Sequence, residues 1–359
     1  MSVYIQSANQ ISAQQPLSDE WFDRPVFYDG IRVPAIDPDF KDYFSPMEAR
    51  RKCTLLKRAV VTSRLTLRDA SVETPDAIIS STGLGCIENT EKFLRSIMEN
   101  DEKFLQPTFF MQSTHNILSS SIAIELKCHG YNNTFVHRGT SFENALLDAF
   151  MQFEQKRVKT VLIGGYDELT DDYFKFLERI GIWDFVPGPS PERKCFAGDV
   201  AVSMLLGTER NGDTICEISD VELMYKPAAD RLRERLDLLL AKAGCGLPDI
   251  DAVLTGLNTN PANDKVYNDV ILQLFDNCPV LQYKHLFGES FSSSALAVYV
   301  AATCLHKNRI PSFLPAYNPP AHSGAVENRR DIKDIKHILI YNHYRNKSHS
   351  FILLSSCSN

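Results

Sequence analysis

The sequence from Asn132 to Phe150 reads NNTFVHRGTSFENALLDAF. This pattern predicts a short strand, a sharp turn at Gly139 and then a capped helix. Many acyl-transfer enzymes present their nucleophile at such a strand–turn–helix elbow, because the turn exposes one side chain beside backbone N–H donors. The exposed position here holds Gly139, which has no side chain and cannot act as a nucleophile.

Length and composition set broad limits on the rest of the chain. The 359 residues are 44% hydrophobic, which is enough to form the core of two domains or of one duplicated domain. The formal net charge is −7, and no block of basic residues stands out. A broad surface for nucleic acid or for an anionic membrane is therefore not expected.

Residues 1–10 lack a basic segment followed by an apolar run, so we expect no secretory signal. The longest strongly apolar stretch, residues 295–305, is too short to span a bilayer. The nine cysteines are scattered without metal-type spacing, which favours reduced thiols in a cytoplasmic protein without a bound metal. No motif calls for a cofactor.

Predicted strands alternate with predicted helices along most of the chain. We expect strands at residues 3–6, 76–81, 160–164, 199–206, 216–224, 251–255, 279–282, 336–342 and 350–355. We expect helices at residues 45–67, 89–98, 116–128, 140–155, 227–242, 264–275 and 289–304. This alternation predicts an α/β fold with mainly parallel strands, and the last two strands are expected to form a hairpin.

Local signals place some of the helix ends. Ser45 and Glu48 form a capping-box pattern at the start of one helix, and Thr140 and Glu143 form a second one after the elbow. Gly130 is expected to end the helix that precedes the elbow strand.

The two halves of the chain show similar patterns. Each contains a helix of small residues, at 119–123 and at 292–302, which we expect to lie sandwiched between other layers. This favours a layered, duplicated fold with one half at residues 1–207 and the other at residues 208–359.

Five segments of the sequence occur in a characteristic order. Residues 107–145 contain the elbow, and residues 161–168 form a strand that ends in Gly-Gly-Tyr-Asp-Glu. Residues 195–201, 251–264 and 284–294 follow as a turn, a strand with its loop, and a Lys-containing segment. In order and spacing these landmarks resemble the thiolase-like superfamily, specifically the β-ketoacyl-acyl-carrier-protein synthases, which implies a layered αβαβα fold.

Synthases of this family use a cysteine nucleophile and two histidines. The resemblance places Gly139 at the cysteine, Gly256 at the first histidine and Glu289 at the second, so that Lys284 alone matches an active-site residue type. The family's glycine-rich turn is also missing from residues 342–348. A carboxylate at the second histidine would repel an enolate, so the resemblance implies no condensing activity in this chain alone.

Two asparagines complete the comparison with the family site. Asn258 and Asn260 take the places of the threonines that would contact a pantetheine arm. Their amides keep hydrogen-bonding capacity with a changed shape.

The resemblance therefore implies a non-catalytic subunit similar to the chain-length factors of type II polyketide or aryl-polyene pathways. Such a chain would form a heterodimer with an active ketosynthase, with possible contact to an acyl carrier protein, and would bound the partner's acyl tunnel. Eight residues are expected at this interface, and for the first three of them a buried core position is the alternative. The set is Phe109, Phe110, Met111, Gln112, Thr134, Phe135, Val136 and His137.

Two other functions stay open at this level. One is a standalone acyltransferase or thioesterase that uses Cys86, Cys195 or Glu289, although no partner base is apparent in the sequence. The other is a homodimer that binds acyl carrier protein. The remaining histidines, which have no metal-like spacing, are expected to be structural or solvated: His285, His343 and His349.

Overall fold

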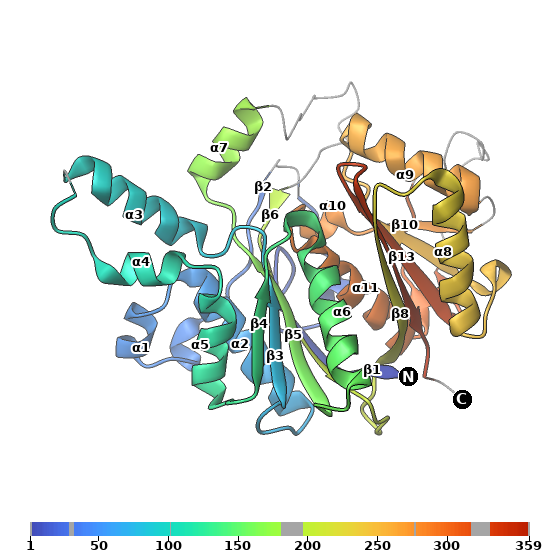
Figure 1. The fold of residues 1–359 in the computed structure, drawn as a ribbon, viewed down its shortest axis with the longest axis horizontal. Coiled ribbons are helices and arrows are strands. Elements are labelled where there is room, and N and C mark those ends of the chain that lie inside the picture. Colours follow the sequence, from blue (N-terminus) through green and yellow to red (C-terminus); the bar gives the residue numbers. More distant parts are fainter. Residues whose placement is uncertain are drawn as a thin grey trace.

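The computed structural model describes residues 2–28, 32–100, 102–180, 197–275, 278–316 and 331–357. One large mixed sheet runs through these residues (Figure 1). Its strands are β1 Val3–Ile11, β3 Ala77–Ser81, β4 Tyr131–Phe135, β5 Thr160–Asp167, β7 Val200–Gly207, β8 Cys216–Tyr225, β9 Ala252–Thr255, β10 Val280–Gln282, β13 His337–Tyr344 and β14 Ser348–Ser355.

The sheet repeats one topology twice. The first half has the order β4-β3-β5-β7-β1 and the second has the order β10-β9-β13-β14-β8. In each half the first two pairings are parallel and the last two are antiparallel. Pairing of β1 with β8 joins the halves. The division at residues 207 and 208 stays a prediction; it falls in the connection between β7 and β8.

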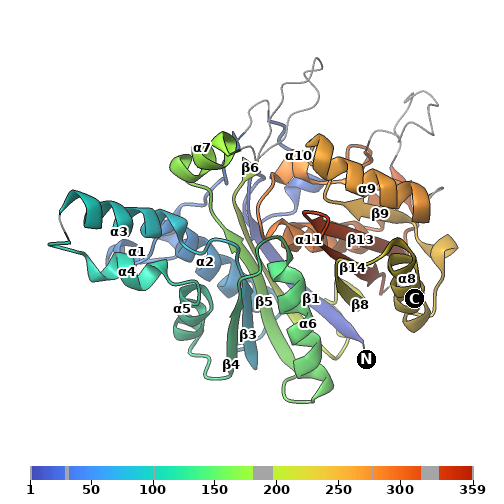
Figure 2. The ribbon, with the colours of Figure 1, turned by 45° about the horizontal axis from the view of Figure 1, so that its top comes forward.

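Helices cover the sheet in layers. The middle layer consists of α6 (Ser141–Glu154) and α11 (Ser293–His306), and each of them contacts strands of both halves. α2 (Thr54–Asp69) and α5 (Ile117–Leu126) cover the outer face of the first half. α8 (Ala229–Lys242) and α9 (Pro261–Leu274) lie beside the second half (Figure 2). This arrangement is the predicted α/β fold with duplicated αβαβα layers. The expectation of mainly parallel strands is wrong, because five of the nine pairings in the large sheet are antiparallel.

Smaller elements complete the fold around these layers. Strand β2 (Arg32–Val33) pairs with β6 (Ala197–Gly198), and β11 (Arg309–Ile310) pairs with β12 (Ile332–Lys333). The short helices are α1 Pro46–Arg50, α7 Asp171–Arg179, α10 Lys284–Phe287, η1 Glu20–Phe22, η2 Phe40–Asp42, η3 Arg138–Thr140 and η4 Leu247–Asp249.

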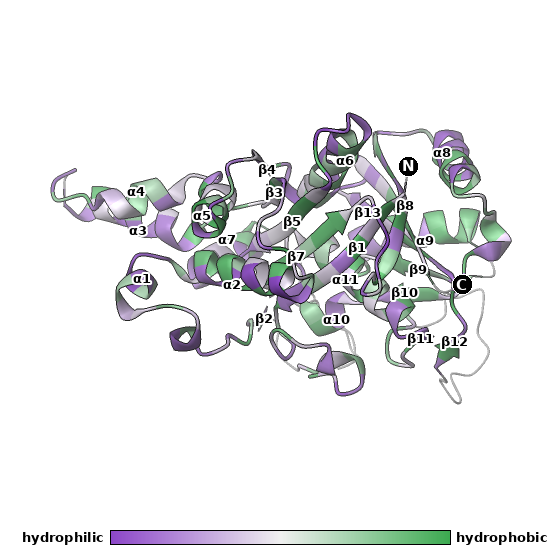
Figure 3. Ribbon diagram, turned by 90° about the horizontal axis from the view of Figure 1, so that it is seen from below, coloured by the Kyte–Doolittle hydropathy of each residue, from purple (hydrophilic) through white to green (hydrophobic). Residues whose placement is uncertain are grey.

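The composition of α11 explains its central place. Every residue from Ser293 to Leu305 is buried, and the small side chains allow neighbours to approach from all sides. The outer helix α8 instead mixes hydrophilic and hydrophobic residues (Figure 3) and carries ion pairs such as Arg233–Asp237 on its exposed face.

One part of the fold projects away from the layers. Helices α3 (Ile87–Glu99) and α4 (Pro107–Ser113) pack on each other and extend to one side of the molecule (Figure 1). We refer to α3 and α4 together as the arm. α4 also contacts α5, and α5 contacts β4, so the arm continues into the edge of the sheet.

Several local predictions need correction. The helix expected at residues 45–67 is two helices, α1 and α2, although the Ser45–Glu48 capping box is present. The residue that ends α5 is Lys127, with φ 52°, and not Gly130. Lys127 is in the left-handed region, and its backbone N–H closes the last turn.

The buried helix of the first half was also misplaced. We expected residues 119–123 of α5 to be sandwiched, but Ile124 on that helix is 78% exposed, and α6 is the middle helix instead. The second capping box is absent, because Thr140 makes no side-chain cap bond and Glu143 points into the protein interior. The hairpin of β13 and β14 is confirmed.

Candidate functional site

The elbow lies where β4 passes through η3 into α6. Its left-handed residue is Arg138, with φ 53°, and not Gly139, where we expected the sharp turn. Ser141 stabilises the turn because its hydroxyl accepts from the backbone N–H of His137 at 2.8 Å and contacts the carbonyl oxygens of Thr82 and Arg138.

Gly139 faces an aromatic ring. A Cβ atom added to Gly139 would lie 2.9 Å from Cγ of Tyr344 and closer still to Cδ2 of that ring. Tyr344 is the last residue of β13, and its ring packs edge-on against Phe291 at a centroid distance of 6.2 Å. The ring of Tyr344 therefore occupies the space that any side chain at Gly139 would need.

Two side chains occupy the space beside Gly256, which follows β9. A Cβ atom there would lie 2.9 Å from Nζ of Lys284 and closer still to the hydroxyl oxygen of Tyr267. That hydroxyl donates to Oδ1 of Asn342 at 2.7 Å. A histidine at this position would displace a buried tyrosine and a buried lysine.

Lys284 and Glu289 form an ion pair with 2.5 Å between Nζ and Oε2. The Asn258 amide and the Ser293 hydroxyl also donate to the Glu289 carboxylate, at 2.9 Å and 3.2 Å. Burial would lower the pKa of Lys284, but the Glu289 carboxylate and the phenols of Tyr283 and Tyr267 outweigh it and raise this pKa above its ordinary value. The pair is therefore charged and, taken together, neutral.

Asn258 and Asn260 already form hydrogen bonds within the chain. Besides its bond to Glu289, Asn258 accepts from the backbone N–H of Asn260 and from the side chain of Asn263. Oδ1 of Asn260 caps α9 by accepting from the backbone N–H groups of Ala262 and Asn263, both at 3.0 Å. Both residues line the same cavity, but their main bonds are structural.

Sequence reasoning missed the role of Glu143. This carboxyl is fully buried and accepts from Asn342, Ser294 and Ser350 at 2.9, 3.1 and 3.2 Å. Burial raises the pKa of Glu143 above its usual range. Its spacing from Thr140 imitated a capping box, and no signal in the sequence indicated that its bonds cross to the second half.

A cavity of about 640 Å³ opens between the elbow, α7, α9 and the β13–β14 turn. Its lining includes Arg138, Tyr173, Glu289, Ser290, Phe291 and Arg345. Gly139 and Lys284 also border it, so the cavity occupies the region of the site that the resemblance implies.

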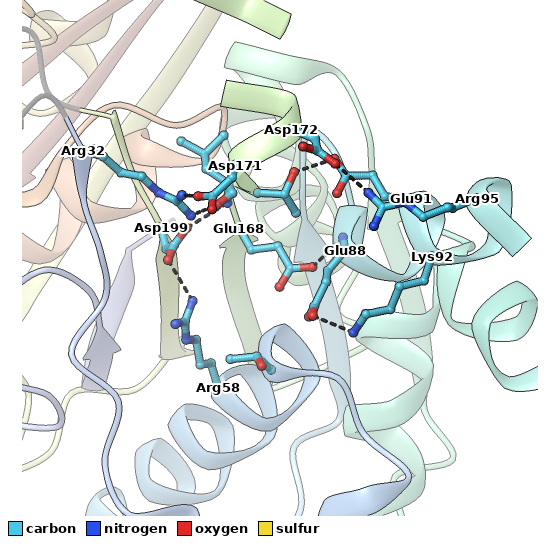
Figure 4. Close-up of a pocket in the computed structure, with 13 residues that line it drawn as sticks. Arg32, Arg58, Glu88, Glu91, Lys92, Arg95, Glu168, Asp171, Asp172 and Asp199 are labelled. Atoms are coloured by element: carbon cyan, nitrogen blue, oxygen red, sulfur yellow. Dashed lines mark hydrogen bonds and ion pairs between the residues drawn. The ribbon is translucent and has the colours of Figure 1, made fainter. Parts of the chain in front are cut away.

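A second cavity, of about 470 Å³, lies between α2, α3 and the end of β5 (Figure 4). Ion pairs surround it: Arg32–Asp171, Arg58–Asp199, Lys92–Glu88 and Arg95–Asp172. Glu168 reaches into it and accepts from the backbone N–H of Glu88 at 3.1 Å. Burial, with the nearby charges of Glu88 and Asp199, raises the pKa of Glu168 to about 7.

The residues expected at an interface are divided between surface and interior. On the arm, Phe110 and Met111 are exposed, and Phe110 packs on Phe93 at 5.3 Å between centroids. Gln112 is buried, and its carbonyl accepts from the backbone N–H of Cys53 and from the Asn89 amide. Gln112 therefore supports the arm and does not reach the surface.

The edge strand carries the rest of that set. Thr134 shares a hydrogen bond with Ser119 at 2.6 Å, and Phe135 packs against the core beside His137. Val136 and His137 are exposed, whereas Phe109 is half-buried under the Lys92 ammonium group. Phe109, Phe110 and Met111 are therefore not buried core residues.

The first candidate cysteine nucleophile lies in the protein interior. Cys86 is fully buried, and a hydrogen bond with Cys53 together with burial raises the pKa of its thiol. A protonated, buried thiol is a poor nucleophile. Cys195 lies outside the described residues. His343 is neutral at pH 7, because burial lowers its pKa to about 3, and its Nε2 lies 3.1 Å from the carbonyl oxygen of Asn263.

The described residues contain neither a metal site nor a membrane-spanning helix. No group of three or more His, Cys, Asp or Glu residues in those ranges is placed to hold a metal ion. Within the same part of the chain, no helix has the length and hydrophobicity to cross a membrane.

Residues 33–191 match the family model described as the N-terminal domain of beta-ketoacyl synthase. No curated protein matches the sequence. Among solved structures, the chain is similar to the ishigamide ketosynthase/chain length factor, with 16% identity, 99% of each chain covered and a TM-score of 0.83.

Two further structures are similar over the same length. A beta-ketoacyl synthase from Burkholderia phymatum STM815 has 13% identity and a TM-score of 0.81, over 99% of this chain and 100% of that one. A type II polyketide ketosynthase, solved with its acyl-carrier protein, has 12% identity, 99% coverage of both chains and a TM-score of 0.79. The chain therefore has the thiolase-like ketosynthase fold, and its N-terminal part matches that family's model.

Proposed function

We propose that this chain is a non-catalytic ketosynthase-like subunit, comparable to a chain-length factor. It pairs with an active β-ketoacyl-acyl-carrier-protein synthase, bounds the acyl tunnel of that partner and works in the cytoplasm. The pathway class is polyketide, aryl-polyene or fatty-acid-like biosynthesis. The partner supplies the cysteine and both histidines, and an acyl carrier protein delivers the chain to it.

The packing of Tyr344 on Gly139 carries this proposal. A condensing enzyme needs a nucleophile at the elbow and hydrogen-bond donors around the developing oxyanion. This chain has glycine at the elbow, glycine at the place of the first histidine, and the carboxylate of Glu289 at the second. The ring of Tyr344 and the Lys284–Glu289 pair fill the same space with stable contacts.

The edge of the sheet supports the pairing. Within the described residues, β4 pairs with β3 on one side, and no strand covers its other edge. An open edge beside apolar side chains needs a covering partner to avoid aggregation. The exposed apolar residues of the arm, the loop between α3 and α4, α5, β4 and the position after β4 are Leu94, Met98, Phe104, Phe110, Met111, Ile124, Tyr131 and Val136.

The arm supports a role in tunnel length. Phe110 and Met111 are more than half exposed, although their side chains are large and apolar. Phe110 is held by Phe93, so its position is fixed before a partner binds. An acyl chain that grows toward this surface would meet these two side chains.

The alternative of a standalone acyl-thioester enzyme has less support. Cys86 is buried with a raised thiol pKa, and the Glu289 carboxylate is engaged by three donors. A homodimer that binds acyl carrier protein is favoured by one observation, which is the cavity of about 640 Å³ beside the elbow. The partner experiment separates these functions.

The test is reconstitution with the ketosynthase encoded beside this chain, and with the carrier protein of the same cluster. We expect Phe110→Ala and Met111→Ala to lengthen the product, because a smaller side chain leaves a longer tunnel. Leu238→Ala, an exposed apolar change on α8, serves as the matched control and should leave product length unchanged. Unchanged product length in both arm variants would contradict the tunnel role.

A further inference from the structure

The second cavity, between α2, α3 and the end of β5, holds more carboxyl groups than cations (Figure 4). Six carboxyl side chains and four cationic side chains line it, so two carboxyl groups are in excess. Each of the four cations has a carboxylate partner, in the pairs Arg32–Asp171, Arg58–Asp199, Lys92–Glu88 and Arg95–Asp172. The lining carboxyl groups that have no ion pair among the described residues are those of Glu91 and Glu168.

Glu91 and Glu168 bridge the same two segments of the chain. Oε1 of Glu168, directly after β5, accepts from the backbone N–H of Glu88 in the first turn of α3. Oε1 of Glu91, one turn further along α3, accepts from the hydroxyl of Thr170, which caps α7 two residues after Glu168. Each carboxyl group therefore uses one oxygen to tie α3 to the connection between β5 and α7. Within the described residues, neither Oε2 atom has a hydrogen bond.

Glu168 is the inner member of this pair of carboxyl groups. It is 6% exposed and reaches into the cavity (Figure 4). The charged groups around it are Arg58 of α2, Glu88 of α3 and Asp199 before β7. Arg58 has no charge to spare, because it already contacts Asp37 at 2.6 Å and Asp199 at 3.1 Å.

A buried carboxyl group without a counter-charge is costly to a folded protein. The anion loses its hydration without a compensating cation, and the neutral form must hold a proton above the usual pKa of the group. Burial, with the charges of Glu88 and Asp199, raises the pKa of Glu168 in this way. Such a group at a cavity wall is typical of a site where a ligand supplies the missing charge.

We infer that the second cavity binds a small aliphatic amine, with a protonated amino group held by the carboxylates of Glu168 and Glu91. An ammonium group has three N–H donors, and its hydrogen bonds to carboxylates are charge-assisted. A metal ion fits less well, because no group of three or more ligating side chains in the described ranges is placed to hold one. The volume of about 470 Å³ leaves room for the carbon chain of the amine.

This site goes beyond the proposed function and does not depend on it. No residue lines both the second cavity and the cavity beside the elbow. Binding of an amine to the isolated chain tests the site, whereas capture of a ketosynthase tests the proposed function. Failure of one therefore leaves the other in place.

The test is calorimetric titration of the purified full chain with 1,4-diaminobutane, 1,4-butanediol and magnesium chloride. The diamine offers one positive charge to each of the two surplus carboxylates. We expect it to bind at least tenfold more tightly than the diol or the metal ion. Glu168→Gln and Glu91→Gln should each weaken its binding at least fivefold. Glu99→Gln, at an exposed position of α3 outside the cavity lining, is the matched control and should bind as the native chain does.

The pH dependence of binding gives a second readout that a general loss of structure would not imitate. The pKa of Glu168 is about 7, so part of the population is protonated at pH 7 and must lose that proton when an ammonium group binds. An aliphatic amine stays charged in this range. Affinity should therefore fall as pH is lowered from 8 to 6, and titrations in buffers of different ionisation enthalpy should detect proton release. Glu168→Gln should abolish both effects.

A melting curve for each variant confirms that it is folded before titration. The inference is overturned if the native chain binds no 1,4-diaminobutane, or if the diol or magnesium binds equally well. It is also overturned if Glu168→Gln keeps the native affinity in a folded protein.

Discussion

The ring of Tyr344 lies against the α-carbon of Gly139, so that a Cβ atom at Gly139 would be 2.9 Å from Cγ of the ring. The contact joins the elbow of the first half to the last residue of β13 in the second half. A side chain at position 139 would therefore require a change at Tyr344 as well.

This contact predicts strong coupling between the two residues. Gly139→Ala should destabilise the protein by about 1–3 kcal/mol, because the added methyl group overpacks against Tyr344. In the background of Tyr344→Ala the same change should cost far less. A double-mutant cycle from chemical denaturation measures the coupling free energy. Gly212→Ala, where no atom lies within 4 Å of an added Cβ, is the control, and additive effects would contradict the packing argument.

The Lys284–Glu289 pair predicts a large cost when one charge is removed. Glu289→Gln should lower the free energy of unfolding by about 3–5 kcal/mol, because it leaves the buried Lys284 ammonium without a counter-charge. The double variant Lys284→Met with Glu289→Gln should recover much of that loss. Equal stability of Glu289→Gln and the native chain in denaturant titrations would show that the pair is not buried as described.

Lys284 also predicts a loss of stability in alkali. Its folded pKa lies above the value of an unfolded lysine, which is about 10.4. The ion pair therefore contributes fully below that pH, and its contribution is lost as pH rises further through the folded pKa. The native chain should lose stability above about pH 10 more steeply than the double variant without the pair, as measured by urea denaturation.

The carboxyl group of Glu168 predicts a second dependence of stability on pH. Its folded pKa of about 7 lies above that of an unfolded glutamate, so the folded state holds the proton more tightly. Its contribution to stability is present below about pH 4.5 and is lost as pH rises through 7, by about 3 kcal/mol over that range. Glu168→Gln should remove this slope from urea titrations, and Glu154→Gln, at an exposed site, should keep it.

Ser290 predicts a gain in stability on truncation. Its buried hydroxyl lacks a partner in the described residues, so Ser290→Ala should raise the free energy of unfolding by about 1 kcal/mol. Ser293→Ala, the neighbouring control, should lower it, because Ser293 donates to Glu289 at 3.2 Å. If Ser290→Ala is also destabilising, the hydroxyl has a hydrogen-bond partner in the folded protein, which contradicts the prediction.

Much of the fold was predictable because its signals are local. The alternation of apolar runs and capped helices identified the strands of the large sheet but not the short strands β2, β6, β11 and β12, and the order of five segments indicated the ketosynthase fold. The middle helix of the first half was misassigned, since small residues in α5 gave the same pattern as a buried helix. Burial depends on which elements pack outside a helix, and no local pattern encodes that.

From the sequence, the site was predictable only as positions where expected catalytic side chains are missing. Gly139, Gly256 and Glu289 stand out in the sequence because the resemblance places each at a catalytic position of the family, but the side chains that fill the space come from elsewhere in the chain. Tyr344 reaches Gly139 from the other half of the chain, and Tyr267 reaches Gly256 from α9 of the same half. Arg138 and Arg345 come from distant parts of the chain, so their place in the lining of one cavity has no sequence signal.

The central claim is that this chain acts through a catalytic partner. The most direct measurement is native mass spectrometry after co-expression with the ketosynthase encoded beside it. Val136→Asp, directly after the edge strand, and Leu272→Asp on α9 are the matched apolar-to-charged variants. The account predicts a one-to-one complex that Val136→Asp disrupts and Leu272→Asp preserves. A homodimer of this chain that takes up no ketosynthase would contradict it.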